Sequence, residues 1–217
     1  MMEEVKKGLK LIKYGSGLKL NIAVAIGFLV LGSLMLCIGP EGMFTGVFYI
    51  IVGPSMLLQL ECSLLYSAAC ASSGKRKLLE ITLPDFFILI TAIVGYVAMV
   101  GVTAFWSIKE PTEAEACMKM MLVSGFILMC MLIYFGVAYK YFVFSIIAFI
   151  AGLLVGMLGG NVVIDFWKME YRFTNCALLC LVFVTVGVIL SCVLRRVLYR
   201  KPVSSLAAGA NLRKALQ

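Results

Sequence analysis

The sequence predicts an all-α integral membrane protein with six transmembrane helices. The chain has 217 residues, of which 63% are hydrophobic and only 14% are charged, whereas the surface of a soluble domain needs more charge than this. The apolar residues fall into long runs, and a helix needs roughly 20 of them to cross the hydrocarbon core. The length therefore accommodates about six spans and leaves no room for a soluble catalytic domain.

Residues 1–19 are predicted to form an amphipathic helix on the membrane surface. Val5, Leu9 and Ile12 recur at helical spacing with lysines between them, which is typical of an interfacial helix. The alternative is the start of a signal peptide. However, no small-residue cleavage site follows the next apolar run, and that run is long enough for a full span. The interfacial helix is therefore the better interpretation.

The transmembrane domain is expected over residues 20–194, followed by a basic tail over 195–217. Its spans are predicted at about 21–38, 44–71, 86–106, 120–139, 142–158 and 176–194. Only Tyr139-Lys140-Tyr141 separates the fourth and fifth spans, so these two helices should form an antiparallel hairpin. Polar and apolar residues mix between 160 and 175, which favours a re-entrant or interfacial element before the sixth span.

The segment Ser72–Asp85, SSGKRKLLEITLPD, is the strongly charged interior part of the chain. It predicts a short amphipathic helix between the second and third spans, ended by Pro84. Its apolar edge comprises Leu78, Leu79 and Leu83, and its polar edge comprises Lys75, Arg76, Lys77 and Glu80. Such a segment is a candidate docking surface for another protein, although many charged loops are only solvated connectors.

The second predicted span contains the polar residues Gln59 and Glu61. A carboxylate inside the hydrocarbon region is costly unless it is paired or hydrated, and such residues often mark a substrate path. A structural partnership with a neighbouring helix explains Glu61 equally well. Both interpretations stay open at this point.

The distribution of basic residues predicts the orientation. Six spans place both termini on one face, together with the charged segment and Lys140. All 19 Lys and Arg residues fall on that face except Lys109, Lys119, Lys168 and Arg172. Because cytoplasmic loops carry an excess of Lys and Arg, both termini and the charged segment are predicted to be cytoplasmic.

Several kinds of site are not expected. The chain has no His and no clustered metal ligands, which disfavours a metal site, and Gly74-Lys75 lacks the other residues of a phosphate-binding loop. Basic residues flank apolar runs instead of forming a patch with aromatic residues, which disfavours nucleic acid. Most of the eight cysteines are interpreted as small packing residues; a bond between Cys117 and Cys176 is left open. We expect no enzymatic activity and no cofactor.

The order of these elements resembles the permease subunits of ABC transporters of the type-2 export class. As architecture, the resemblance covers essentially the whole chain: the N-terminal amphipathic helix, a long second span, the helix that follows it, a tight hairpin and a semi-apolar element before the sixth span. In sequence it depends mainly on Ser73–Pro84. The chain departs from many members by lacking a large extracellular domain between the first two spans.

This resemblance implies a homodimer or heterodimer of six-span subunits in the lipid bilayer of the bacterial plasma membrane, with two separate ATPase subunits beneath it. It also implies that the N-terminal helix and residues 75–83 dock onto the ATPase, which hydrolyses ATP. The element over 160–175 would form a re-entrant helical pair near the outer leaflet. The expected substrate is amphipathic, such as a peptide, a lipid or a drug-like molecule, and is exported from the cytoplasm.

Two other classes of function are considered. An ATP-independent secondary transporter or channel should show inverted repeats and polar residues near the midplane of several spans, and neither is evident apart from Glu61. A non-transporting membrane scaffold would use the charged segment only as a connector, and no site in the sequence excludes it.

Overall fold

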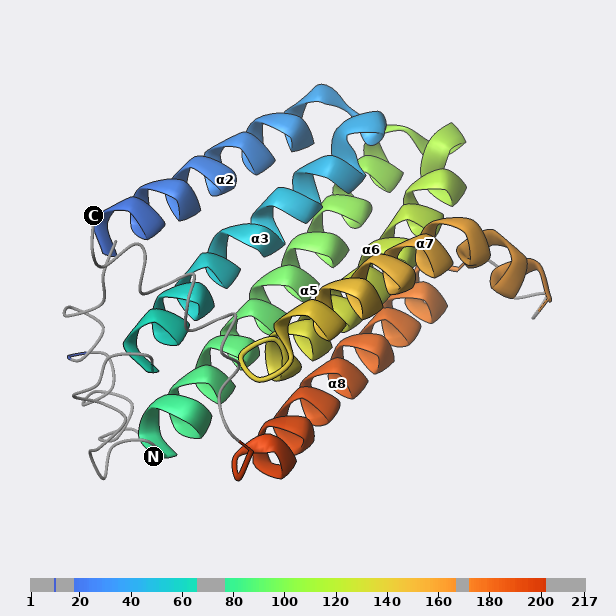
Figure 1. Ribbon diagram of the computed structural model, residues 1–217. Helices are drawn as coiled ribbons and strands as arrows, with labels where there is room; N and C mark the ends of the chain where they lie inside the picture. The colour runs from blue at the N-terminus through green and yellow to red at the C-terminus, as the bar shows by residue number, and fades with distance from the viewer. Residues whose placement is uncertain (1–9, 11–17, 66–76, 167–171, 202–217) are drawn as a thin grey trace.

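The structure, a computed structural model, describes residues 10, 18–65, 77–166 and 172–201. Apart from short turns these ranges are helical, and they contain no strand. Figure 1 shows the long helices packed side by side. They are α2 (Leu18–Ile38), α3 (Pro40–Leu65), α5 (Leu83–Lys109), α6 (Ala114–Val137), α7 (Phe142–Phe166) and α8 (Phe173–Leu198), with the short helices η1 (Leu78–Thr82) and η2 (Pro111–Glu113).

Four helical segments in the described part of the chain are long and apolar enough to cross a membrane. They are Leu18–Ile38, Glu80–Lys109, Pro111–Val137 and Phe173–Leu198. The described apolar stretches of α3 and α7 are shorter, Glu41–Gly53 and Val143–Val155. The protein is therefore an α-helical membrane protein with several apolar helices, and the number of six spans stays a prediction.

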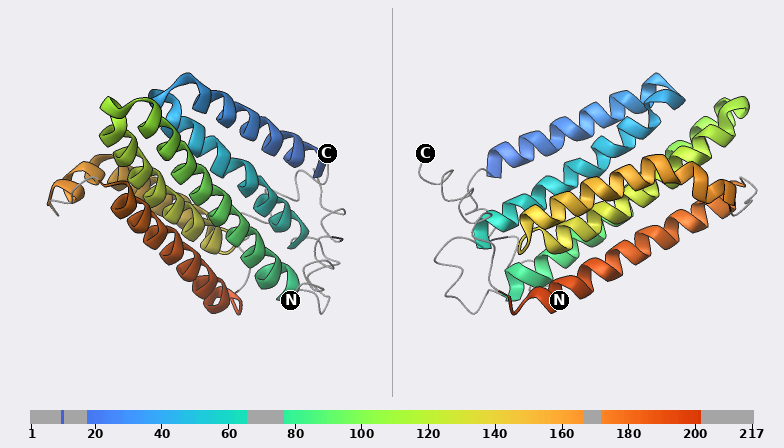
Figure 2. Two further views of the ribbon diagram at one scale, coloured as in Figure 1. Left: turned by 180° about the vertical axis from the view of Figure 1, so that it is seen from behind. Right: turned by 45° about the vertical axis from the view of Figure 1, so that its right-hand side comes forward.

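α6 lies at the centre of the bundle. It packs against α3, α5, α7 and α8. The only extensive contact that α2 makes in the described part of the chain is with α3. In both figures α2 lies at one edge of the bundle and α8 at the opposite edge (Figures 1 and 2). The side chains of Met121, Leu128 and Leu132 on α6 are buried in the core. Outward side chains such as Ile147 and Val197 are apolar and exposed, as expected for helices that face lipid.

Glycines allow the closest helix contacts. A Cβ atom on Gly136 of α6 would lie 2.6 Å from the Ser191 Oγ and 2.9 Å from the Ser191 Cα on α8, so only a residue without a side chain fits there. Gly39, between α2 and α3, has a φ of +147°, which other residues rarely adopt. The tight turn that reverses the chain at this point therefore depends on glycine.

The predicted hairpin of the fourth and fifth spans is present, since α6 ends at Val137 and α7 begins at Phe142. Two boundary predictions are wrong. Pro84 does not end a helix, because η1 continues directly into α5 and Pro84 lies in the first turn of α5, where its missing N–H is tolerated.

The second wrong boundary is the expected break at residue 160, because α7 continues to Phe166. Glycines are common in membrane helices and do not end α7 here. Residues 167–171 and the tail beyond residue 201 lie outside the described part of the chain. Most residues of the predicted surface helix lie outside it as well. The re-entrant element and the surface helix therefore stay predictions.

Candidate functional site

Three segments that are far apart in the sequence meet at one end of the bundle. Successive helices alternate in direction, so η1 at the start of α5, the turn 138–141 after α6 and residues 195–201 at the end of α8 lie at the same end. Figure 1 shows the start of α5 and the end of α8 near each other. Each segment contributes polar groups that the rest of the chain buries.

Glu80 and Lys140 form a buried ion pair. The Lys140 Nζ lies 3.1 Å from the Glu80 Oε2, and the two side chains are 0% and 2% exposed. The same Nζ donates a hydrogen bond to the Lys201 carbonyl at 2.7 Å. Charges so fully removed from solvent are stable only when they are paired and hydrogen-bonded. Lys140 thus ties η1 to the end of α8.

Arg195 joins the same segments through backbone carbonyls. Its guanidinium donates to the Glu80 carbonyl at 3.2 Å and to the Phe135 carbonyl at 2.9 Å. Pro84 has no N–H to offer the Glu80 carbonyl four residues earlier, and Phe135 lies in the last turn of α6, where carbonyls lack helical partners. Arg195 therefore supplies side-chain donors to backbone carbonyls in η1 and at the end of α6.

Tyr139 completes this arrangement. Its hydroxyl donates to the Arg195 carbonyl at 3.2 Å. Its ring has the Lys140 Nζ at 4.9 Å and the Arg195 guanidinium carbon at 5.1 Å from its centroid, both within the range of a cation–π interaction. We refer to Glu80, Tyr139, Lys140 and Arg195 as the charged cluster.

A second ion pair flanks the charged cluster at its surface. Arg196 lies 3.7 Å from Asp85, and its side chain is 65% exposed while that of Asp85 is 19% exposed. Exposed pairs of this kind contribute little to stability. The fixed geometry at this end of the bundle therefore comes from the buried residues.

The charged cluster is suited to hold helices together and transmit motion. Its groups are already engaged with one another, and the described residues contain no group of three side chains that could hold a metal ion. Because both Lys140 and Arg195 bind Glu80, a displacement of η1 must carry the ends of α6 and α8 with it or break buried polar contacts. The polar contacts of the charged cluster therefore link the positions of η1 and the ends of α6 and α8.

The residues of the predicted docking segment differ in their exposure to solvent. Lys77 is exposed and Leu78 is half-buried, but Glu80 and Leu83 are 2% and 0% exposed. The placement of Glu80 on a solvated polar edge, available to a partner, is therefore wrong. Its carboxylate faces the bundle because Lys140 neutralises it there.

Other predicted site residues cannot be placed in detail. Lys75 and Arg76 lie outside the described residues. The backbone of Leu79 belongs to η1, and Gln59 and Glu61 lie in α3, but the side chains of these three residues are outside the description. The roles predicted for them stay predictions.

Sequence reasoning missed Tyr139, Lys140 and Arg195 as site residues. Lys140 was expected only in the short cytoplasmic link between the fourth and fifth spans, and Arg195 only as the first residue of the basic tail. The pairs that they form with Glu80 span 60 and 115 residues of sequence, so no spacing rule reveals them. The single signal was the unusual Tyr-Lys-Tyr turn itself.

The two cysteines considered for a disulfide are not bonded. Cys117 at the start of α6 and Cys176 at the start of α8 are both free and buried. They act as small core residues, as do other cysteines of the bundle.

Comparison with known protein families, with curated proteins and with solved structures finds no match for this chain.

Proposed function

We propose that this protein is the membrane-spanning permease subunit of an exporter powered by a separate ABC-type ATPase. The observation that carries the proposal is the charged cluster, which attaches η1 to α6 and α8. A force applied to the basic segment just before η1 would reach the core helix of the bundle through these contacts. A subunit that receives work from a partner needs such a connection.

Because Glu80 and Leu83 are buried, the proposed docking surface comprises the remaining predicted residues, Lys75, Arg76, Lys77, Leu78 and Leu79. ATP binding moves the ATPase, the docking segment follows, and the ends of α6 and α8 move with it as one body. This motion opens and closes a path for an amphipathic substrate at the interface between two permease subunits. Gln59 and Glu61 on α3 are proposed to contact that path.

Docking is tested with two variants of matched charge. One reverses the basic residues before η1 by replacing Lys75, Arg76 and Lys77 with Glu. The control reverses three basic residues at the opposite end by replacing Lys109, Lys119 and Arg172 with Glu. Tagged protein is purified from the cells that produce it, and its partners are identified by mass spectrometry.

We expect an ABC-type ATPase to accompany the wild-type protein and the control and to be lost from the docking variant. Absence of an ATPase from the wild-type preparation, or equal retention by both variants, contradicts the proposal. Transport by the purified protein alone in vesicles without nucleotide would instead support a secondary transporter.

The proposed orientation places both termini and the docking segment in the cytoplasm of a bacterium. In a cysteine-free background, a thiol reagent that cannot cross membranes should label Thr112→Cys in intact cells, since this residue lies exposed in η2. The same reagent should label Ser73→Cys only after the cells are permeabilised. The opposite pattern would invert the orientation and remove the docking surface from reach of a cytoplasmic ATPase.

A further inference from the structure

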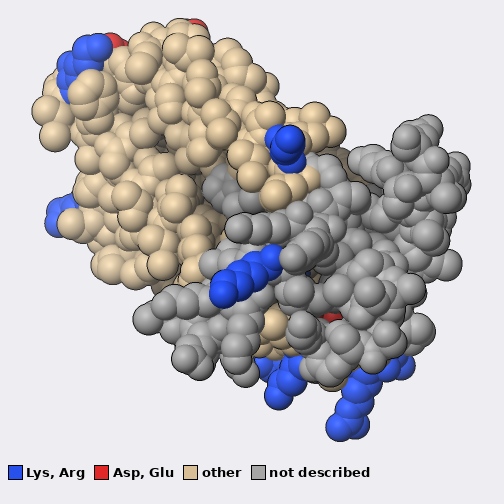
Figure 3. All heavy atoms as spheres, turned by 90° about the vertical axis from the view of Figure 1, so that its left-hand side faces the viewer, with Lys and Arg blue, Asp and Glu red and all other residues tan. Residues whose placement is uncertain are grey.

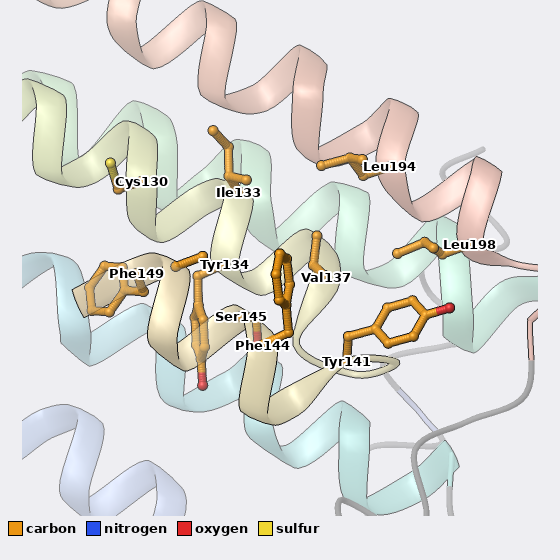
Figure 4. Close-up of a pocket in the computed structure, with 11 residues that line it drawn as sticks. Cys130, Ile133, Tyr134, Val137, Tyr141, Phe144, Ser145, Phe149, Leu194 and Leu198 are labelled. Atoms are coloured by element: carbon orange, nitrogen blue, oxygen red, sulfur yellow. The ribbon is translucent and has the colours of Figure 1, made fainter. Parts of the chain in front are cut away.

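A groove of about 400 Å³ runs along α6 between α7 and α8 (Figure 4), within the volume range of ligand pockets. Its walls are almost entirely apolar and include Cys130, Ile133, Phe144, Phe149 and Leu194. In Figure 4 these side chains converge from the three helices on one space. Hydrocarbon is therefore the chemistry that fits its interior.

The groove extends along the helices over a limited depth. On α6 its lining residues run from Cys130 to Val137, which corresponds to about 10 Å at the rise of an α-helix. One leaflet provides about half of the roughly 30 Å hydrocarbon thickness. An acyl chain that enters from the end at which the charged cluster lies can therefore fill the groove from a single leaflet.

Two exposed basic residues follow the groove wall closely in sequence at its mouth. Tyr141, in the turn after α6, and Leu198, at the end of α8, line the groove at this end. The Lys140 Nζ in the same turn donates a hydrogen bond to the Lys201 carbonyl at 2.7 Å. This contact holds the backbone of Lys201 close to the turn that contains Tyr141. Arg200 and Lys201 are exposed, and neither side chain forms an ion pair with another residue that the structure describes.

The charge at this end favours an anionic ligand. The described carboxylates here are already paired, Glu80 with Lys140 and Asp85 with Arg196. Figure 3, which faces this side of the molecule, shows separate Lys and Arg side chains projecting from it. A negatively charged group at the mouth would therefore meet cations with no competing acid on the described surface beside Arg200 and Lys201.

We propose that the groove binds one acyl chain of an anionic phospholipid, whose head-group phosphate is held by Arg200 and Lys201. The apolar walls accept the chain, and the two cations select the head group. Each basic residue near an anionic lipid surface contributes about 1 kcal/mol, or about fivefold in affinity. The two together favour an anionic over a zwitterionic lipid by about 30-fold. This site is independent of any ATPase.

The test uses the purified full-length protein and two lipids with the same acyl chains, phosphatidylglycerol and phosphatidylcholine. Binding is followed by native mass spectrometry and by the shift in thermal unfolding as each lipid is added to the detergent solution. The wild-type protein should bind phosphatidylglycerol about 30-fold more tightly than phosphatidylcholine. Soluble glycerol 3-phosphate should produce no shift, because it has no acyl chain to fill the groove.

Two pairs of variants separate the head group from the chain. Replacing Arg200 and Lys201 with Gln should abolish the preference for phosphatidylglycerol, whereas replacing Lys109 and Arg172 with Gln at the opposite end should preserve it. An unchanged preference in the first variant overturns the proposal, and so does equal binding of both lipids by the wild type.

The second pair alters the apolar wall. Ala148→Phe should fill the groove and weaken binding of both lipids, while Ile150→Phe, at an exposed position on the other side of α7 that does not line the groove, should not. If Ala148→Phe binds phosphatidylglycerol like the wild type, the groove is not the site. The Gln variants leave the apolar wall intact, so they decide the question even if Ala148→Phe does not fold.

Discussion

The buried ion pair makes a sharp prediction for Glu80→Gln. This change keeps the shape of the side chain and removes its charge, so the Lys140 ammonium stays buried without its carboxylate. Removing one partner of a buried pair costs about 3–5 kcal/mol. Lys140 retains its contacts with the Lys201 carbonyl at 2.7 Å and with the Tyr139 ring. We therefore expect the free energy of unfolding to fall by an amount near the lower end of this range, about 3 kcal/mol.

Thermal unfolding in detergent measures this loss. For a chain of this size, 1 kcal/mol corresponds to a change of about 2–4 °C in Tm, so Glu80→Gln should lower Tm by about 6–12 °C. The double variant with Lys140→Met removes both charges and should recover much of the loss, because no unpaired charge is left in the interior.

Glu115→Gln is the matched control. It breaks the Lys119–Glu115 pair, which has a similar distance of 2.9 Å but side chains that are 37% and 61% exposed. An exposed pair within one helix is worth about 0.3–0.5 kcal/mol, so Tm should change by less than about 2 °C. If Glu80→Gln lowers Tm no more than this control, or if the double variant is as unstable as both single losses added together, the reasoning is refuted.

Two further predictions concern the end of α8 and its contact with α6. Arg195→Met should lower the free energy of unfolding by about 3 kcal/mol or more, since two carbonyls lose their donors at about 1–3 kcal/mol each. The control Arg196→Met should lower it by less than about 1 kcal/mol. Equal effects of the two variants in chemical denaturation would contradict the role given to Arg195. Gly136→Ala should destabilise by about 1–3 kcal/mol through contact with α8, whereas Gly101→Ala, with nothing within 4 Å, should be neutral or stabilising by up to about 1 kcal/mol. A neutral Gly136→Ala would show that the two helices are not closely packed there.

The sequence predicted the helices well because their signal is local. Long apolar runs require helices in a membrane, and the hairpin between α6 and α7 followed from the short interval between two such runs. The boundary at Pro84 was less secure because Pro is tolerated in the first turn of a helix. The boundary at residue 160 rested on a change from apolar to mixed composition, and α7 continues through that change to Phe166.

The site was only partly predictable, because burial of a charge depends on partners that are distant in sequence. The segment around Glu80 was identified from its charge, but an amphipathic pattern alone places such a carboxylate in water. Lys140, which pairs with the Glu80 carboxylate, lies 60 residues later, and Arg195, which binds the Glu80 carbonyl, lies 115 residues later. The packing of α5, α6 and α8 against one another brings them together, and the contact between α6 and α8 depends on small residues such as Gly136, which also occur in many unrelated membrane helices.

The order in which the charged cluster is synthesised has a consequence for biogenesis. Because the chain is made from its N-terminus, Glu80 and Lys140 reach the membrane before Arg195 and the Lys201 carbonyl exist. Until then the acid and the ammonium can pair, but the carbonyls of Glu80 and Phe135 have no guanidinium to bind. Insertion of the last helix is therefore the event that closes this end of the protein, and a chain truncated before it would present these polar groups to the quality-control machinery of the membrane.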